Sequence, residues 1–361
     1  MRKKSRRKLF YLLLALFLIV SPLLIAYSLG YNFDFFKGRV GKTGGIFIKS
    51  KTVRISIFIN GTFEKETSLF SGGALLTDIA PQTYLLRLEK EAYQPWSKAV
   101  AVEPSIVTEI RNILLLPRPV TYATSTAKEI ALFLEKNPPA KLLIDKKDNL
   151  IRPEGAAKKI LASNVNSFAE FEEYILFVDK NGFLAKMDPA TNKIETLGRP
   201  GFYLNKNKMT FVKSAGGAIA ILDSSGGLFL LESDNKVSAL KGGVKKISFD
   251  GGGHKLLLTK EQSVEILRLQ DNPEQPFQKK GAFEEILKLD SPINEASWFY
   301  ADNAHIAIRT DAGIFFTEVD GRGGRNTAEL VSDKINELLT SEKIPDAVFF
   351  RKGKIWFKIK I

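Results

Sequence analysis

An uninterrupted apolar run, LFYLLLALFLIVSPLLIAYSL at residues 9–29, is the first clear pattern along the chain. The run holds no charged residue, and as a helix it is long enough to cross the roughly 30 Å apolar layer of a bilayer. The apolar core of a signal peptide is usually about 7–15 residues, and only IAYSLG offers a weak cleavage site. We therefore expect an uncleaved membrane helix, with a cleaved signal as the alternative.

Residues 1–8 carry the densest charge in the chain, with six Lys or Arg residues and no acid. Cytoplasmic flanks of membrane helices are enriched in Lys and Arg. We predict a basic cytoplasmic tail at 1–8 and a single transmembrane helix at 9–30. A linker at 31–44 and the rest of the chain then lie outside the cytoplasm, at the cell membrane.

Strict alternation of apolar and polar residues begins shortly after this linker. In VRISIFIN, the side chains of Ile55, Ile57 and Ile59 fall on one face of an extended strand. Asn60-Gly61 follows at once, and both residues tolerate the positive φ angles of a type I′ hairpin turn. The pattern predicts an all-β domain at residues 45–117.

Four segments of this domain follow one another in a recognisable order: GIFIKS at 45–50, IFING at 57–61, IAPQTY at 79–84 and KEAYQPW at 90–96. In order and spacing they resemble the PEGA domain, a small β-sandwich of bacterial and archaeal envelope proteins. Where that family has glycine, this chain has Gln82 and Ala92, and the segment that names the family is KTVR here. The resemblance implies a structural or adhesive role and brings no catalytic residues.

A second β-rich region follows a Pro-rich break at 118–140, which we expect to be a linker with a short helix. From residue 141 onward, a unit of apolar strand, polar turn and apolar strand recurs about every 40 residues. The copies begin at residues 141, 174, 218, 254, 305 and 346. This repeat predicts a β-propeller of about five or six blades at 141–361, closed by pairing of its last strand, KIWFKIKI, with its first.

Two of the repeats carry more specific motifs. SFDGGGHKLLLT at 248–259 and SWFYADNAHIAI at 297–308 resemble a stretch that recurs in TolB-like and WD-repeat-like propellers. IFFTEVDGRGGRN at 314–326 is similar to the strand and turn that follow this stretch in the same family. The resemblance implies a propeller in a membrane-anchored bacterial envelope protein.

Groups that could carry out chemistry are few. The chain has no cysteine and only two histidines, His254 and His305, which occupy the same position of consecutive repeats just before an apolar strand. That placement favours a turn position set by the repeat over a metal ligand or a catalytic group. We expect no cofactor, no metal and no catalytic residue, and the sequence does not assign a binding residue.

Other chemically suggestive residues have a structural explanation beside a functional one. Paired glycines such as Gly226-Gly227 lack the spacing of a phosphate loop and indicate β-turns. Three aspartates are expected in turns, with the mouth of a ligand site as the alternative: Asp179, Asp188 and Asp223. Three tryptophans are expected in cores, with a sugar-stacking platform as the alternative: Trp96, Trp298 and Trp356.

The net charge and the domain organisation together limit the possible functions. The formal net charge is +13, of which the tail supplies six, so the remaining excess is mild and we expect no nucleic-acid partner. We expect a single-pass membrane protein that displays a propeller for binding an envelope protein or glycan, and we expect no enzymatic activity. The alternative is a propeller enzyme, a glycan lyase or hydrolase, which two or three inward-facing acids with raised pKa would favour.

Overall fold

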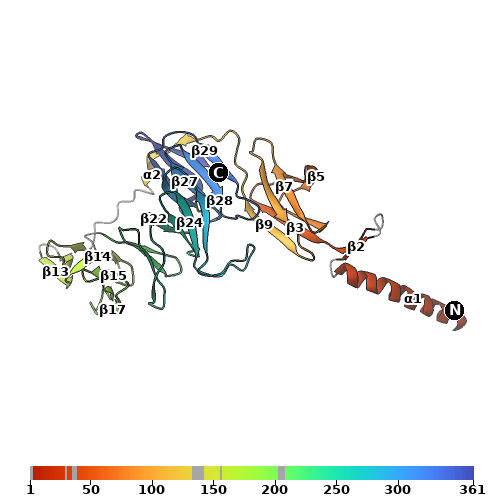
Figure 1. Ribbon diagram of the computed structural model, residues 1–361, viewed down its shortest axis with the longest axis horizontal. Helices are drawn as coiled ribbons and strands as arrows, with labels where there is room; N and C mark the ends of the chain where they lie inside the picture. The colour runs from red at the N-terminus through yellow and green to blue at the C-terminus, as the bar shows by residue number, and fades with distance from the viewer. Residues whose placement is uncertain (1–2, 29–30, 35–38, 132–141, 155–156, 202–207) are drawn as a thin grey trace. The chain divides into compact units, whose positions relative to one another are not determined.

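The computed structural model describes residues 3–28, 31–34, 39–131, 142–154, 157–201 and 208–361 (Figure 1). Contacts between residues divide the chain into two compact units. Unit 1 comprises Met1–Pro119 together with two short segments from later in the chain, Glu274–Pro276 and Asp320–Asn326. Unit 2 comprises the rest, from Val120 to the C-terminus. The expected division at 45–117 and 141–361 did not foresee the two short segments.

Helix α1 (Lys3–Ser28) covers the apolar run and contains Pro22. Its stretch Arg7–Ala26 has a mean hydropathy of 2.7, and none of it is buried. The helix therefore has the length and composition of a membrane anchor or of a signal sequence. Beyond it, the expected linker contains two paired strands, β1 (Tyr31–Asp34) and β2 (Arg39–Lys42).

Unit 1 contains a β-sandwich made of two sheets. One sheet has the order β6-β3-β9, in which β3 runs antiparallel to β6 and parallel to β9. The other sheet is antiparallel and has the order β5-β4-β7-β8. Their bounds are β3 (Gly44–Ser50), β4 (Ser56–Ile59), β5 (Thr62–Glu66), β6 (Gly73–Ile79), β7 (Thr83–Glu89), β8 (Trp96–Ala101) and β9 (Val107–Ile113).

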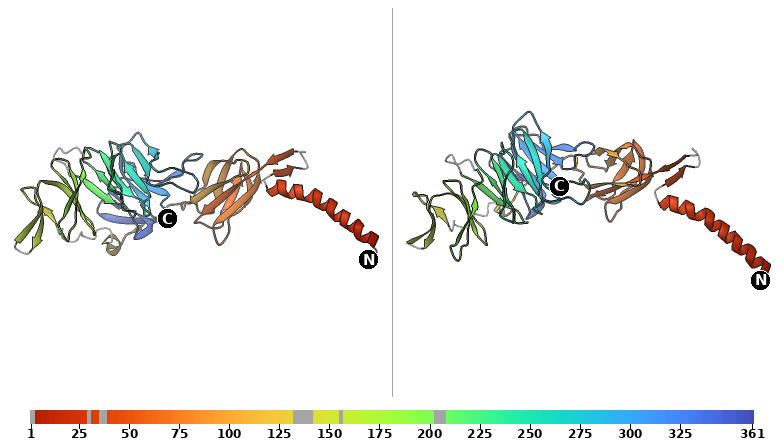
Figure 2. Two further views of the ribbon diagram at one scale, coloured as in Figure 1. Left: turned by 90° about the horizontal axis from the view of Figure 1, so that it is seen from below. Right: turned by 60° about the horizontal axis from the view of Figure 1, so that its bottom comes forward.

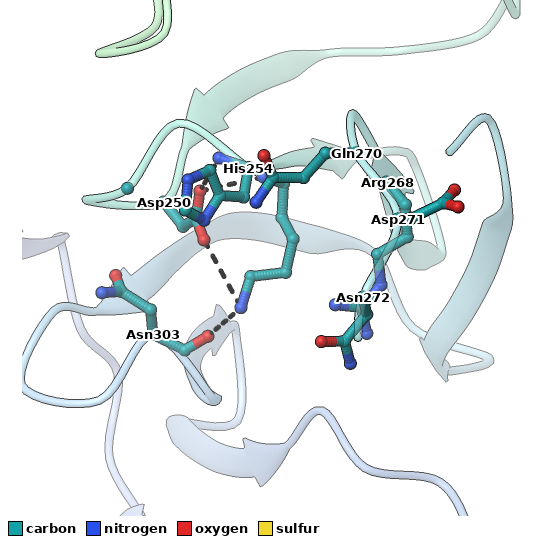
Figure 3. Close-up of a pocket in the computed structure, with 9 residues that line it drawn as sticks. Asp250, His254, Arg268, Gln270, Asp271, Asn272 and Asn303 are labelled. Carbon is teal, nitrogen blue, oxygen red and sulfur yellow. Dashed lines mark hydrogen bonds and ion pairs between the residues drawn. The ribbon is translucent and has the colours of Figure 1, made fainter. Parts of the chain in front are cut away.

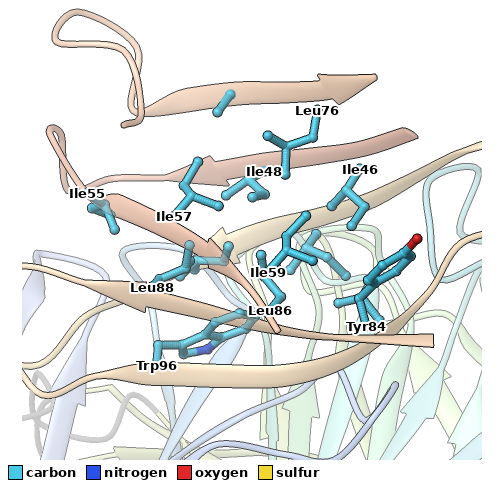
Figure 4. Close-up of a cluster of buried hydrophobic side chains, with 14 of the residues drawn as sticks. Ile46, Ile48, Ile55, Ile57, Ile59, Leu76, Tyr84, Leu86, Leu88 and Trp96 are labelled. Atoms are coloured by element: carbon cyan, nitrogen blue, oxygen red, sulfur yellow. The ribbon is translucent and has the colours of Figure 1, made fainter. Parts of the chain in front are cut away.

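The core of the sandwich lies between the two sheets (Figure 4). Ile46 and Ile48 of β3 are fully buried in the same cluster as Ile57 of β4 and Leu86 and Leu88 of β7. Alternate residues of β3, β4, β6 and β7 supply this cluster, because successive side chains of a strand point to opposite faces. The predicted apolar face at Ile55–Ile59 is thereby confirmed.

Two turns of the sandwich contain residues with positive φ angles. Asn60 and Gly61 have φ angles of 50° and 84°, as a type I′ turn demands, and they join β4 to β5, so the predicted hairpin is confirmed. Ala92 also has a positive φ, of 62°, at the position where the PEGA pattern has glycine. Gln82, the other departure, is not in the left-handed region.

The segments Glu274–Pro276 and Asp320–Asn326 bond to β8 and β9 within unit 1. The guanidinium of Arg322 donates to the carboxylate of Asp320 at 2.7 Å and to the carbonyl oxygen of Glu109 at 2.7 Å. The buried amine of Lys98 donates to the carbonyl oxygen of Asp320 at 2.8 Å. The side-chain amide of Gln275 donates to the carbonyl oxygen of Val107 at 2.9 Å. Unit 1 is therefore not continuous in sequence.

The described residues of unit 2 form six antiparallel sheets, which follow one another in chain order from green through cyan to blue in Figure 2. In the first five, strands pair in the order of the sequence: β11-β12-β13, β14-β15-β16-β17, β18-β19-β20-β21, β22-β23-β24-β25 and β26-β27-β28-β29. The sixth has the order β10-β32-β31-β30.

The first three sheets hold β11 (Leu143–Ile144), β12 (Leu150–Glu154), β13 (Ala157–Ala162), β14 (Val165–Glu170), β15 (Ile175–Asp179), β16 (Leu184–Met187), β17 (Ile194–Gly198), β18 (Thr210–Lys213), β19 (Ile219–Leu222), β20 (Leu228–Leu231) and β21 (Val237–Ala239). The last three hold β22 (Lys246–Phe249), β23 (Lys255–Thr259), β24 (Ser263–Arg268), β25 (Phe283–Lys288), β26 (Ile293–Phe299), β27 (His305–Thr310), β28 (Ile314–Glu318), β29 (Thr327–Val331), β30 (Glu337–Ser341), β31 (Ile344–Lys352), β32 (Ile355–Lys360) and β10 (Ala123–Thr124).

All six predicted strand-turn-strand repeats are hairpins, and in the four sheets from β14 to β29 they form the two central strands. Buried side chains join neighbouring sheets: Ile219 and Ile221 of β19 pack with Leu176 and Val178 of β15. In these four sheets, the repeats thus mark the most buried strands.

The end of the chain pairs with a strand that the sequence did not indicate. The expected partner of the final strand was the first strand after residue 141, but β32 pairs with β10, which lies in the expected linker. The short helix expected in that linker is α2 (Ala127–Ala131), and the rest of the expected linker from residue 132 to 140 lies outside the described residues. The hydroxyl of Thr126 accepts from the amide of Glu129, whose carboxylate accepts from the amide of Thr126, which is a capping box.

Candidate functional site

A polar pocket of about 310 Å³ lies among three connections of unit 2 (Figure 3). The first connection, between β22 and β23, contributes Asp250, Gly252 and His254. The second, between β24 and β25, contributes Gln270–Asn272, and the third, between β26 and β27, contributes Asn303. Lys255 and Arg268, at the ends of β23 and β24, complete the lining. We call this site the polar pocket.

The strand order explains why these connections meet. In an antiparallel sheet of four strands, the connection after the first strand and the connection after the third strand leave at the same end. The second connection, residues 269–282, is much longer than its counterparts at 188–193 and 232–236. It is therefore an insertion relative to the repeat, and it provides one wall of the polar pocket.

Lys255 is the central charged group of the pocket. Its amine lies 3.4 Å from the carboxylate of Asp250 and donates to the backbone carbonyl of Asn303 (Figure 3). The amine also lies 5.0 Å from the ring centroid of Trp298. Burial lowers the pKa of Lys255, and nearby Asp250 opposes this shift without cancelling it. The charged form is thus stabilised less than in water.

The other charged groups of the pocket also have partners. The guanidinium of Arg268 lies 3.7 Å from the carboxylate of Glu284. Asp271 pairs with Lys279 at 2.9 Å and accepts a hydrogen bond from the amide of Lys280; the latter bond is the largest cause of its lowered pKa. Asp250 accepts from the backbone amides of His254 and Lys255, at 2.7 and 2.9 Å. The lining is rich in polar groups but balanced in charge.

The two histidines do not occupy equivalent positions, so the prediction that they share one is wrong by one residue. The carbonyl of His254 accepts from the amide of Leu269, and in the next sheet it is Ala304 whose carbonyl accepts from Val319. His305 therefore corresponds to Lys255. His254 is exposed in the polar pocket.

His305 is buried, with 4% of its surface exposed. Its Nδ1 lies 2.8 Å from the carboxylate of Asp302, and its ring stacks on Phe316 with centroids 5.2 Å apart. Among the described residues, no group of three or more His, Asp or Glu side chains is placed to hold a metal ion. His305 is the first residue of β27, so it lies at the start of a strand and not in the turn that we expected.

The aspartates singled out from the sequence are turn residues. One carboxylate oxygen of Asp179 accepts from the amides of Asn181 and Phe183, and Asp223 does the same with Ser225 and Gly227. Asp188 accepts from the amides of Ala190 and Thr191. Gly182 and Gly226 adopt positive φ in these turns, which confirms the turn interpretation.

The tryptophans are mostly core residues. Trp96 belongs to the sandwich core with 4% exposure, and Trp298 is fully buried, with its indole N–H donating to the carbonyl of Ser248 at 3.2 Å. Trp356 is partly buried against the cluster that contains Phe349. None of the three lines either pocket described for unit 2, which does not support the sugar-stacking alternative at these sites.

A second pocket of about 290 Å³ is built from connections of the same kind. Its lining includes Tyr174, after β14, and Glu232, Ser233 and Asn235, after β20. The amines of Lys186 and Lys213 lie 4.2 and 5.4 Å from the centroid of the Tyr174 ring. Burial is the main cause of the raised pKa of the Tyr174 hydroxyl. Two pockets on such connections make them the candidate binding region of unit 2.

Comparisons with known proteins give only distant likenesses. No protein-family model matches the chain, and no curated protein matches it. Among solved structures, the β-propeller domain of Cps50 (Swd1) from Myceliophteria thermophila is similar at 11% identity and a TM-score of 0.34, over 61% of this chain and 95% of that one. YCF48 from Cyanidioschyzon merolae is similar at 10% identity and a TM-score of 0.37, over 85% of this chain and 96% of that one.

Proposed function

We propose that the protein is a single-pass membrane protein whose unit 2 is a β-propeller that binds a protein or glycan partner outside the cytoplasm. Helix α1 is the anchor, with residues 1–8 as a cytoplasmic tail. The PEGA-like sandwich is a spacer between the anchor and the binding unit. The exposed apolar stretch Arg7–Ala26, with its mean hydropathy of 2.7, supports the anchor.

The arrangement of strands supports the propeller. Each sheet from β14 to β29 is a four-stranded antiparallel meander, and consecutive sheets share buried side chains. The pairing of β10 with β32 joins the beginning of unit 2 to its end. Propellers use such a pairing to avoid leaving edge strands exposed.

The partners and the pKa values of the carboxyl groups favour binding over catalysis, and they are the main support for the proposed function. In the polar pocket, Asp250 accepts from two backbone amides and Asp271 pairs with Lys279. Throughout the described residues, every carboxyl group with a resolved pKa shift has its pKa lowered, among them Glu265, Glu295 and Asp320. A glycosidase acid or a general base needs a carboxyl group with raised pKa, so the enzyme alternative receives no support here.

The test uses the full chain in lipid nanodiscs, incubated with labelled envelope polymers and a peptide library. Retention on the immobilised protein and release of shorter products are measured separately. Retention without cleavage is the expected result. Metal-independent cleavage that disappears when a carboxyl group of unit 2 is replaced by alanine would refute the binding function and favour the enzyme.

A further inference from the structure

We propose that the polar pocket binds an uncharged, polyhydroxylated ligand, namely a neutral sugar residue of an envelope glycan. The inference rests on the proposed binding function and adds the ligand class and the residues that recognise it. The pocket volume of about 310 Å³ lies at the lower end of the range typical of small-ligand sites. A sugar unit or two is of the right order for such a space.

The charge balance of the lining argues for a neutral ligand. Lys255 and Arg268 are cations, Asp250 and Asp271 are anions, and all four have partners at 2.9 to 3.7 Å. Lys255 and Arg268 are largely buried, with side chains 14% and 10% exposed. An ionic ligand would bring an unpaired charge into this setting or break an existing pair, and either change is costly. A neutral ligand requires neither.

The remaining polar groups suit hydroxyls. Gln270, Asn272 and Asn303 each carry a side-chain amide, which both donates and accepts hydrogen bonds. A sugar hydroxyl also does both, so amides from different walls can bind neighbouring hydroxyls of one ring. Asn303 is positioned for this role by a hydrogen bond of its side chain. Its side-chain oxygen Oδ1 accepts from the amide of Gly251 at 3.0 Å, and this bond fixes the orientation of the side chain.

Two exposed side chains at the pocket are available for a ligand. Within the part of the chain that the structure describes, the side chains of His254 and Gln270 make no hydrogen bond to the protein. Gly252 lies beside them, and a Cβ atom added there would come within 3.0 Å of the His254 ring. Glycine at this position therefore keeps the approach to His254 and Gln270 open.

The insertion that carries Gln270 also indicates a recognition role. In repeat architectures, insertions in single repeats map to loops that often form the binding face. Residues 269–282 form such an insertion, and the polar run Gln270-Asp271-Asn272 begins two residues after the end of β24. The segment Glu274–Pro276 of the insertion bonds to β9, whereas Gln270–Asn272 lines the polar pocket.

The test is a titration of the full chain in lipid nanodiscs, followed by saturation-transfer NMR. The probes are N-acetylglucosamine and galactose as neutral sugars and glucuronic acid as the matched anionic sugar. Gln270→Ala removes one neutral donor and acceptor, and we expect it to weaken neutral-sugar binding by about three- to tenfold. Gly252→Phe fills the pocket and should abolish the signal. Gln82→Ala, an exposed glutamine in unit 1, is the matched control and should change nothing.

Each other outcome overturns the inference in a distinct way. Binding of glucuronic acid but of neither neutral sugar would make the pocket an anion site. Neutral-sugar binding that Gln270→Ala and Gly252→Phe both leave unchanged would place the sugar elsewhere. No binding of any probe would remove the sugar site, while retention of envelope polymers or peptides in the separate assay would keep the proposed function.

Discussion

The carboxylate of Glu295 accepts a hydrogen bond from Nε of Arg309 at 2.8 Å. The two residues lie opposite each other on β26 and β27. The same carboxylate accepts from the amine of Lys246, on β22, and from the backbone amide of Leu338, on β30, both at 2.8 Å. Glu295 thus bonds to three consecutive sheets of unit 2, which makes it a sensitive position for the stability of that unit.

Replacing Glu295 by alanine should lower the free energy of unfolding of unit 2 by about 2–4 kcal/mol. The side chains of Glu295 and Arg309 are only 17% and 14% exposed, so the change leaves a largely buried guanidinium without its carboxylate. Urea unfolding followed by the fluorescence of the buried Trp298 measures the loss. Glu329→Ala, an exposed position on β29, is the control and should cost less than about 0.5 kcal/mol. Equal effects of the two variants would contradict the role of Glu295.

Unit 2 should also lose stability in acid. Burial raises the pKa of Glu295, but the hydrogen bonds from Lys246, Arg309 and Leu338 together outweigh it, and the net pKa is lowered from 4.5. A group with a lowered folded pKa stabilises the protein above its unfolded pKa and loses that contribution as the pH falls through the folded value. The stability difference between wild type and Glu295→Gln should therefore shrink as urea unfolding is repeated from about pH 7 down to about pH 3. A constant difference would show that Glu295 does not titrate in this way.

Ala92→Gly should stabilise unit 1. Ala92 is exposed and has a φ of 62°, a left-handed conformation that costs an L-residue roughly 1–2 kcal/mol. Glycine relieves that cost but loses more backbone entropy on folding, so the expected net gain is about 0.5–1 kcal/mol. Thermal unfolding measures the gain. Ala101→Gly, at an exposed position within β8, should instead destabilise the unit, and a gain from both variants would argue against the conformational explanation.

Much of the β-structure could be predicted from local patterns. The turn at Asn60-Gly61 followed from residue types that accept positive φ, and the six repeated hairpins followed from apolar runs interrupted by polar turns. The pairing of β10 with β32 could not be predicted, because Ala123–Thr124 is a short, exposed strand with no apolar face to signal it. The segments Glu274–Pro276 and Asp320–Asn326 joined unit 1 through backbone and side-chain hydrogen bonds, which leave no periodic trace in a sequence.

The polar pocket could not be predicted from the sequence because its residues belong to three separate connections. In the sequence, Asp250 and Asn303 stand out only as parts of repeat motifs. Gln270–Asn272 lies in a polar stretch that has no motif at all. The available signal was the length of the connection at 269–282 relative to the other repeats, together with the polar run at its start. Strand order then supplied the proximity, which the sequence alone does not give.

The hairpin between β4 and β5 offers a further test of unit 1. Changing Asn60-Gly61 to Val-Val should destabilise the sandwich by about 1–3 kcal/mol per strained residue, because β-branched side chains resist positive φ. It also removes the oxygen of Asn60 that accepts from the amide of Leu85 at 2.9 Å. Hydrogen exchange at β4, β5 and β7 should speed up. Thr62→Val, one residue further on in a strand, is the control, and an effect of similar size from it would mean that the turn geometry is not the cause.

The anchor and its orientation can be tested together. The run at residues 9–29 holds no charged residue and follows the basic residues of the tail, so a reporter that is active only outside the cytoplasm should be active when fused after Ile361. The mature protein should keep its basic tail, as N-terminal sequencing can show. The double variant Leu16→Arg and Leu18→Arg places two charges near the centre of the span, at a cost of about 2.5–3.5 kcal/mol each, and should release the protein from the membrane fraction.

Leu9→Arg is the matched control for this variant. It adds one arginine at the end of the helix, where a long side chain can reach the membrane surface, and it should leave the protein in the membrane. A mature protein that begins near Tyr31 would identify α1 as a cleaved signal rather than an anchor. An inactive C-terminal reporter would reverse the orientation and place unit 2 in the cytoplasm, where envelope glycans would no longer be its partners.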